Sequence, residues 1–216
     1  PLQAADYLLQ SPNGKLTVEI ETKGQLSYTL KHNSQTLLDK SPIGLLLEDK
    51  ILGEDIKISR IKRNSSVKEH IVSPHYRLPS FEVTYNELNL KFKGNYGIIF
   101  RAYNEGIAYR FYTTMKGPLI IKDEMVQMNF PEDYPTFMSY STMPTGEDQY
   151  AMAFQNLYTK SSIKGVDTNN IAFLPITIDC GNELKMTLLE SDLEDYPGMF
   201  IKGDGKNTSL QGTFAH

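Results

Sequence analysis

The chain has 216 residues, a formal net charge of −4 and a pI of about 5.6. No basic stripe indicates nucleic-acid binding, and no apolar run approaches the roughly 20 residues of a membrane span. Cys180 is the only cysteine, which excludes an intrachain disulfide framework but not export. The opening Pro1-Leu-Gln-Ala-Ala lacks the basic start and apolar segment of a signal peptide. The length suits one large all-β domain.

Apolar and polar residues alternate with a period of two along most of the chain, which predicts β-strands. In chain order, strands are expected near residues 15–21, 26–30, 56–58, 81–85, 88–92, 98–102, 107–111, 126–130, 171–180 and 184–188. The turn Asn104-Glu-Gly106 predicts a hairpin between two of them. Pro175 predicts a bulge or an edge position, and only residues 147–157 could form a helix. This pattern is typical of a large antiparallel β-sandwich.

One stretch concentrates acidic residues where an apolar strand ends. Glu190, Asp192, Glu194 and Asp195 follow Leu188-Leu189 and precede a Tyr-Pro-Gly turn. Carboxylates this close together must be solvated, paired or bound to a metal ion. If the chain were extended, the first three would share one face. A solvated turn is the alternative, because Asp before Tyr-Pro-Gly is ordinary turn chemistry.

Other side chains offer weaker candidates for chemistry. Tyr140, Tyr150, Tyr158 and Tyr196 lie in regions that are expected to be loops, where their rings could contact a sugar. His70 and His75 could act with a glutamate as an acid–base pair, although their spacing favours ordinary surface histidines.

Two arginines flank the predicted hairpin turn. Arg101 and Arg110 are expected to pair with Glu105 or with carboxylates on a neighbouring strand. We interpret such pairs as structural.

Five segments in order resemble the N-terminal domain of glycoside hydrolase family 97. They are Ser11-Pro-Asn-Gly-Lys-Leu16, Ser41-Pro-Ile-Gly-Leu45, Phe100-Arg-Ala-Tyr-Asn-Glu-Gly-Ile-Ala-Tyr-Arg-Phe111, Leu189-Glu-Ser-Asp-Leu-Glu-Asp-Tyr-Pro-Gly-Met199 and Leu210-Gln-Gly-Thr-Phe-Ala215. The resemblance implies an all-β, galactose mutarotase-like supersandwich. It also implies a parent α-glucosidase or α-galactosidase of Bacteroides-type polysaccharide metabolism, periplasmic or otherwise exported.

The resemblance assigns Glu190 to a calcium ion whose other ligands lie on a catalytic (β/α)8 barrel of the same polypeptide. Tyr158 and Tyr196 are weaker candidates for contact with an oligo- or polysaccharide substrate. No catalytic residue is expected in this chain, and the isolated domain is expected to be catalytically silent. We expect residues 1–205 to form the domain and residues 206–216 to begin a linker toward the barrel.

Two other classes of function remain open. A stand-alone carbohydrate-binding domain would bind sugar by itself and present an exposed aromatic platform. An aldose mutarotase-like enzyme would bring a histidine and a glutamate together on a concave sheet face.

Overall fold

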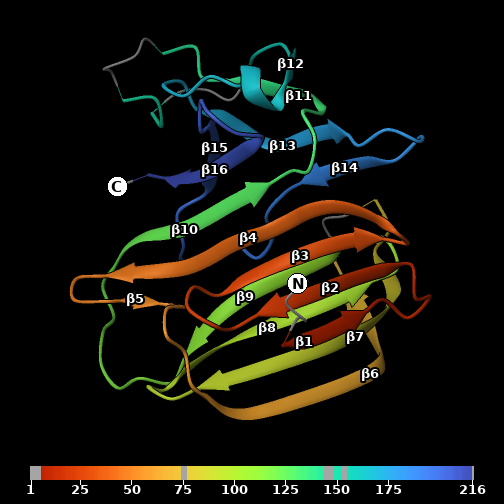
Figure 1. Ribbon diagram of the computed structural model, residues 1–216, viewed down its shortest axis with the longest axis vertical. Coiled ribbons are helices and arrows are strands. Elements are labelled where there is room, and N and C mark those ends of the chain that lie inside the picture. The colour runs from red at the N-terminus through yellow and green to blue at the C-terminus, as the bar shows by residue number, and fades with distance from the viewer. Residues whose placement is uncertain (1–5, 74–76, 144–147, 152–154, 216) are drawn as a thin grey trace. The chain divides into compact units, whose positions relative to one another are not determined.

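A computed structural model describes residues 6–73, 77–143, 148–151 and 155–215 (Figure 1). Nearly all regular structure in these ranges is antiparallel β-strand, and the one helix among them is a single 3-10 turn, η1 (Ile163–Gly165). No helix in the described ranges is long and apolar enough to cross a membrane. The prediction of an all-β, antiparallel fold is therefore confirmed. The chain divides into two compact units, Pro1–Thr36 with Gly53–Ile120, and Leu37–Leu52 with Ile121–His216.

The first unit contains two antiparallel sheets. One consists of β1 (Tyr7–Gln10), β2 (Leu16–Glu21) and β3 (Ser27–His32), in that order. The other consists of β6 (Ile58–Val72), β7 (Ser80–Phe92), β8 (Tyr96–Tyr103) and β9 (Ile107–Thr113). Each strand pairs with its neighbour in sequence, so short turns suffice to connect most of them.

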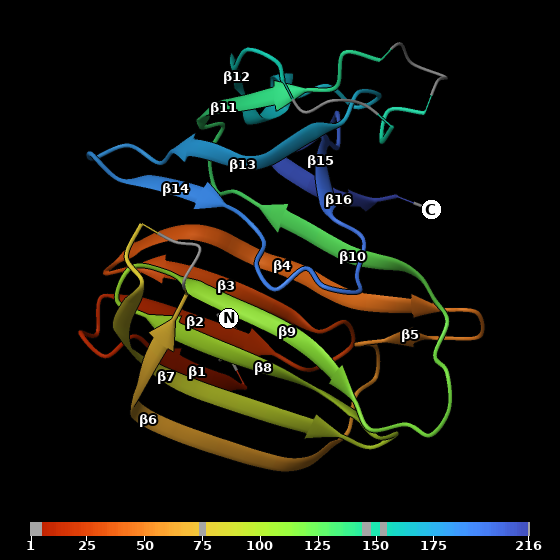
Figure 2. The ribbon, with the colours of Figure 1, turned by 180° about the vertical axis from the view of Figure 1, so that it is seen from behind.

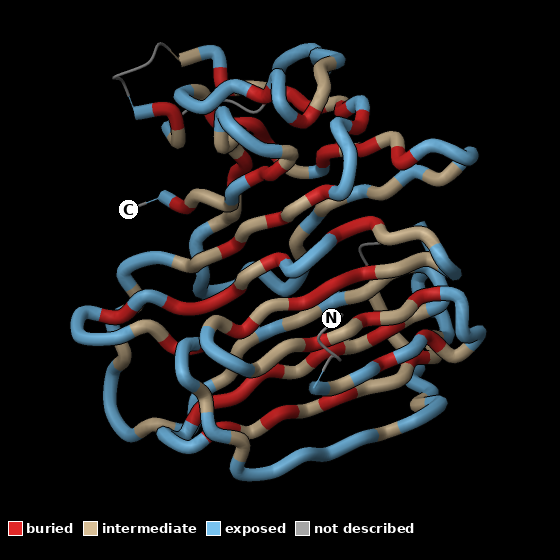
Figure 3. Tube along the Cα trace, in the orientation of Figure 1, coloured by how far each residue is buried: buried red, intermediate tan, exposed pale blue. Residues whose placement is uncertain are grey.

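The core of this unit lies between the two sheets. Val18 and Ile20 of β2, and Ile98 and Phe100 of β8, are fully buried. The Tyr28 ring of β3 packs against Phe100, with 6.1 Å between ring centroids. Burying a large apolar side chain stabilises the folded state by about 1.5–3 kcal/mol. Because side chains alternate between the faces of a strand, every second residue can be buried in this way. The red segments of Figure 3 follow this alternation along the strands.

Strand β7 combines two predicted strands into one. Residues 81–85 and 88–92 were expected to be separate, but Ser80–Phe92 is continuous. Its apolar positions change from odd to even numbers, so they change from one face of the strand to the other. The register with β6 shifts between Asn64 and Val67, opposite this change, and Ser66 there has a φ of 53°. A β-bulge in the partner strand thus accompanies the change of face.

The second unit is built mainly on one antiparallel sheet (Figures 1 and 2). Its strands are β4 (Gln35–Leu47, of which residues 37–47 belong to this unit), β5 (Ile51–Leu52), β10 (Ile121–Asn129), β11 (Pro135–Tyr140), β12 (Thr159–Ser162), β13 (Ala172–Asp179), β14 (Lys185–Leu188), β15 (Met199–Gly203) and β16 (Ser209–Phe214). The order is β4-β10-β16-β15-β13-β11-β12, with β5 on β4 and β14 on β13.

Two details of this unit bear on the sequence predictions. Pro175 lies in β13 where its register with β11 shifts, so the bulge alternative is confirmed. Of residues 147–157, those that are described form turns and irregular chain, so the possible helix does not form in them.

The proposed start of a linker at residues 206–216 is not irregular throughout. Ser209–Phe214 form β16, which pairs with both β10 and β15. The composition concealed this strand, because Gly212 interrupts its apolar pattern and the turn-like residues 204–208 precede it. The domain boundary itself stays a prediction.

We predict that Gly97→Ala destabilises the protein by about 1–3 kcal/mol, because an added side-chain carbon overpacks the sheet. A Cβ at Gly97 would lie 2.5 Å from the Leu90 carbonyl oxygen and 2.6 Å from the Tyr112 ring. Urea unfolding measures the loss. Gly106→Ala is the control, because a Cβ there meets nothing within 4 Å. An equal loss in both variants would contradict the packing explanation.

Candidate functional site

The acidic segment is a loop, which we call the acidic loop (residues 189–198). It connects β14 to β15 in the second unit. The Glu190 Oε2 atom accepts a hydrogen bond of 2.8 Å from the backbone N–H of Met199, the first residue of β15. One carboxylate therefore closes the loop by holding its beginning against its end.

The condition under which three acidic residues would share one face, an extended chain, is not met. Strand β14 ends at Leu188, and Asp192 has a φ of 62°, in the left-handed region. That conformation breaks the alternation on which a shared face depends. Asp192, Glu194 and Asp195 are exposed, while Glu190 is only partly exposed. Glu190 is therefore less exposed to solvent than the other three carboxylates of the loop.

Burial shifts the protonation of Glu190. Loss of water around the carboxylate raises its pKa, and the Met199 N–H bond acts in the opposite direction. The same oxygen lies 3.9 Å from where a Cβ on Gly198 would be, so it sits against the Pro-Gly turn. An ionised carboxylate has about four acceptor positions, so the bond to Met199 leaves capacity for another donor or a cation.

A second carboxylate, on Glu124 of β10, belongs to the same site. The Tyr196 hydroxyl donates a hydrogen bond of 2.9 Å to Glu124 Oε2. Burial raises the pKa of Glu124, and the negative charges of Glu190 and Asp123 raise it further, while the bond from Tyr196 opposes the shift. The charge of Glu190 therefore disfavours the ionised form of Glu124, an effect that a nearby cation would oppose.

Tyr196 ties the acidic loop to the sheet. Its ring packs edge-on against Phe214 of β16, with 6.2 Å between centroids, while its hydroxyl reaches β10. Burial and the charge of Glu124 both raise the pKa of Tyr196, so it remains a neutral donor. The prediction that Tyr196 contacts sugar is untested, but its hydroxyl has a structural role.

Sequence reasoning missed Glu124, although a signal exists. Val126 and Met128 of β10 are buried, and stepping back two residues along the alternation reaches Glu124. A carboxylate on the apolar face of a strand is unusual, because burying a charge is costly.

The other predicted tyrosines lie elsewhere in the second unit. The Tyr158 hydroxyl donates to the carbonyl of Pro175 in β13, at 3.1 Å. The Tyr140 hydroxyl accepts from the backbone of Asp167, and Tyr150 bonds to Thr213 and packs on Phe200. These contacts occupy the three hydroxyls within the protein. Among the described residues, the ring contacts of these three tyrosines do not join them to Tyr196 in one aromatic platform.

The described residues do not complete a metal site by themselves. Among them, no group of three or more His, Cys, Asp or Glu side chains could hold a metal ion. Calcium takes roughly six to eight oxygen ligands. Glu190 fits the role of one ligand, since it is a partly buried carboxylate with remaining acceptor capacity. A third ligand of these side-chain types would come from outside the described residues.

The histidine candidates give an exposed pair in the first unit. His70 of β6 lies opposite Glu82 of β7, and His70 Nδ1 contacts Glu82 Oε1. Their side chains are 55% and 67% exposed, so this is a surface cross-strand pair. His75, the other histidine candidate, lies outside the described residues.

Comparison with known proteins points to one family. The model of the glycosyl-hydrolase 97 N-terminal family matches residues 9–216. A retaining alpha-galactosidase of Bacteroides thetaiotaomicron is 36% identical over 208 residues, covering 93% of this chain. The chain spans only 31% of the length of that relative.

Solved structures share the fold at lower sequence identity. A beta-arabinopyranosidase matches with a TM-score of 0.85 and 18% identity, covering 98% of this chain and 36% of that one. A family 97 glycoside hydrolase of Pseudoalteromonas sp. strain K8, in complex with acarbose, matches with a TM-score of 0.78 and 16% identity. It covers 96% of this chain and 32% of that one.

We predict that Glu124→Gln stabilises the protein more at about pH 7 than at about pH 4. The pKa of Glu124 is raised in the folded state, so ionisation costs stability as the pH rises through that value. Glutamine stays neutral at both pH values and avoids this cost. Urea unfolding at the two pH values measures the difference.

Glu194→Gln is the matched control, because Glu194 is an exposed carboxylate of the same loop. It should show little change between the two pH values. The explanation is wrong if Glu124→Gln instead becomes less stable relative to the parent as the pH rises.

Proposed function

This chain belongs to the glycosyl-hydrolase 97 N-terminal family, and we propose that it is the first domain of an exported enzyme that hydrolyses α-galactosidic or α-glucosidic bonds. The 36% identical relative is a retaining alpha-galactosidase, which favours the α-galactosidic bond of the two. The catalytic acid and the base or nucleophile would lie in a barrel that follows this domain. The chain's share of its relative, 31%, leaves ample length for such a barrel.

The role of this domain would be to support the barrel and to supply Glu190 to a calcium ion. The observation that carries the proposal is the Glu190–Met199 hydrogen bond, which fixes a partly buried carboxylate at a loop. When bound, calcium would polarise substrate hydroxyls as a Lewis acid. The residues of this chain would do something simpler: they orient one carboxylate and restrict its access to water.

Electrostatics supports a cation next to Glu190. Burial raises the pKa of both Glu190 and Glu124, which means that the surroundings disfavour their ionised forms. A divalent cation reverses that preference, because it stabilises the charged carboxylate that coordinates it. Glu124, whose carboxylate accepts a hydrogen bond from Tyr196, would not bind the cation directly. Its negative charge would attract the cation to the site.

The proposed location is the periplasm or another exported compartment. The single thiol suits such a compartment, because Cys180 is buried and burial raises its pKa to about 11. A buried thiol that stays protonated reacts slowly with oxidants.

We predict that Glu190→Gln weakens calcium binding at least about 10-fold in the polypeptide that carries both this domain and its catalytic domain. Hydrolysis of an aryl α-galactoside should fall with it and recover in part at high calcium. The amide keeps the bond to Met199 possible but removes the charge. Calcium titration of activity measures both effects.

Asp195→Asn is the control for lost charge in the same loop, because Asp195 is exposed. It should leave the calcium dependence unchanged. Unaltered calcium affinity in Glu190→Gln would remove Glu190 from the metal site and leave the domain a purely supporting role.

A further inference from the structure

The four-stranded sheet of the first unit has a second face, which points away from β1, β2 and β3. Residues directly opposite in register, and residues two apart on a strand, share a face. Two adjacent rows on the second face follow from the pairing. One row is Arg60, Lys91, Gly97 and Tyr112, and the other is Lys62, Asn89, Ile99 and Arg110.

These two rows carry positive charge and contain no acidic residue. Arg60 and Lys91 are direct cross-strand neighbours, and Lys62 lies two residues from Arg60 on β6. Like charges placed directly opposite destabilise a sheet. Arg60 and Lys62 are exposed and Lys91 is partly exposed. The chain as a whole has a net charge of −4, so the positive charge of this cluster is opposite in sign to that of the protein.

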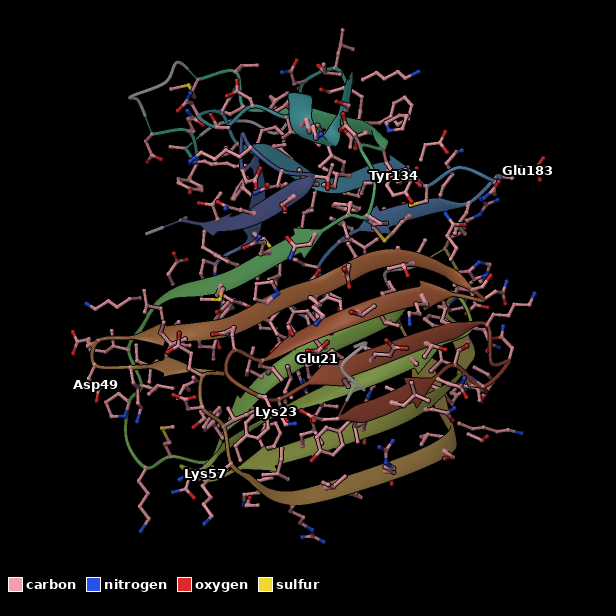
Figure 4. The ribbon with its side chains drawn as sticks, viewed as in Figure 1. Glu21, Lys23, Asp49, Lys57, Tyr134 and Glu183 are labelled. Carbon is pink, nitrogen blue, oxygen red and sulfur yellow. The ribbon has the colours of Figure 1, made fainter. Side chains whose placement is uncertain are left out.

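In the next row of the same face, a positive and a negative side chain pair with each other. Arg101 Nε lies 2.9 Å from Glu87 Oε2, and the guanidinium stacks over the Tyr85 ring at 4.3 Å. This confirms the prediction that Arg101 pairs with a carboxylate on a neighbouring strand. The positive field is therefore confined to one end of the sheet. Lys57, labelled in Figure 4, precedes β6 at that end, and its carbonyl accepts from the Lys93 N–H.

Protection of a sheet edge explains only part of this charge. Strand β6 is an edge strand, exposed along most of its length in Figure 3. Lysine and arginine on such a strand discourage pairing with another chain. Lys91 lies on β7, which is hydrogen-bonded to strands on both sides and needs no protection. Edge protection therefore does not account for the charge of Lys91 beside Arg60.

The face also has a flat aromatic surface. Gly97 leaves space that the Tyr112 ring occupies, since a Cβ there would lie 2.6 Å from that ring. The Tyr112 hydroxyl donates to Asn89 Oδ1 at 2.8 Å, which leaves the amide N–H groups of Asn89 as donors. A ring lying on a sheet, with amide donors and cations around it, suits an extended ligand with both apolar and anionic groups.

We propose that this cationic face, formed by Arg60, Lys62 and Lys91 with Tyr112 and Asn89, binds a polysaccharide that carries carboxylate groups. The cations attract the carboxylates, and the ring and amide contact the sugars between them. Strands about 4.8 Å apart place the charges at regular intervals along a flat surface, which suits a polymer better than a small ion. The choice of a polysaccharide over other polyanions rests on the proposed function.

The test measures binding of the 216-residue chain to polygalacturonate by calorimetry, with neutral dextran as the comparison. The variant Arg60→Gln/Lys62→Gln/Lys91→Gln should bind polygalacturonate at least about 10-fold more weakly, and salt should weaken the parent in the same way. The control Lys15→Gln/Lys164→Gln/Lys206→Gln removes three exposed cations elsewhere and should bind within about twofold of the parent. Equal urea midpoints establish that both variants fold.

Three results would overturn the proposal. Dextran could bind as tightly as polygalacturonate, or both triple variants could lose affinity equally. Polyglutamate could also bind as tightly as polygalacturonate, which would make the face a site for acidic protein. None of these results bears on Glu190, whose calcium role has a separate readout, so failure here is distinguishable from failure of the proposed function.

Discussion

The hydrogen bond from the Met199 N–H to Glu190 Oε2 is the contact on which the candidate site depends. It closes the acidic loop onto the first residue of β15 and leaves a partly buried carboxylate in a fixed place. Without it, Glu190 would be one of several carboxylates in a solvated turn, which is the alternative that composition favours. A hydrogen bond to a charged group contributes more than one between neutral groups, so a single bond can select the loop conformation.

The sheet of the second unit gives that loop its surroundings. Strand β10 supplies Glu124, β16 supplies Phe214, and Tyr196 contacts both. Holding two carboxylates in partly buried positions costs stability, and the raised pKa values of Glu124 and Glu190 express that cost. Sites that accept such a cost are often functional. Family membership supplies an independent reason to connect this cost with a glycoside hydrolase.

Much of the fold could be predicted from alternation, and the exceptions have physical causes. Val18, Ile20, Ile98 and Phe100 were correctly assigned to strands because one face of each strand is buried. Most of β6 was missed because an exposed edge strand has little reason to alternate, and its register also shifts at a bulge. Glu190 was found through resemblance, since turn chemistry alone favours a solvated loop. Glu124 could not be paired with Tyr196 in advance, because the contact joins residues 72 positions apart.

The central claim is that Glu190 is one ligand of a calcium site completed outside this chain. Calorimetric titration of the 216-residue chain with calcium, beside Glu190→Gln, tests it most directly. The account predicts that both proteins bind calcium no tighter than about millimolar, because a single well-placed carboxylate cannot supply the roughly six to eight oxygens that calcium takes. Tight binding that Glu190→Gln abolishes would contradict it, because the site would then be complete within this domain.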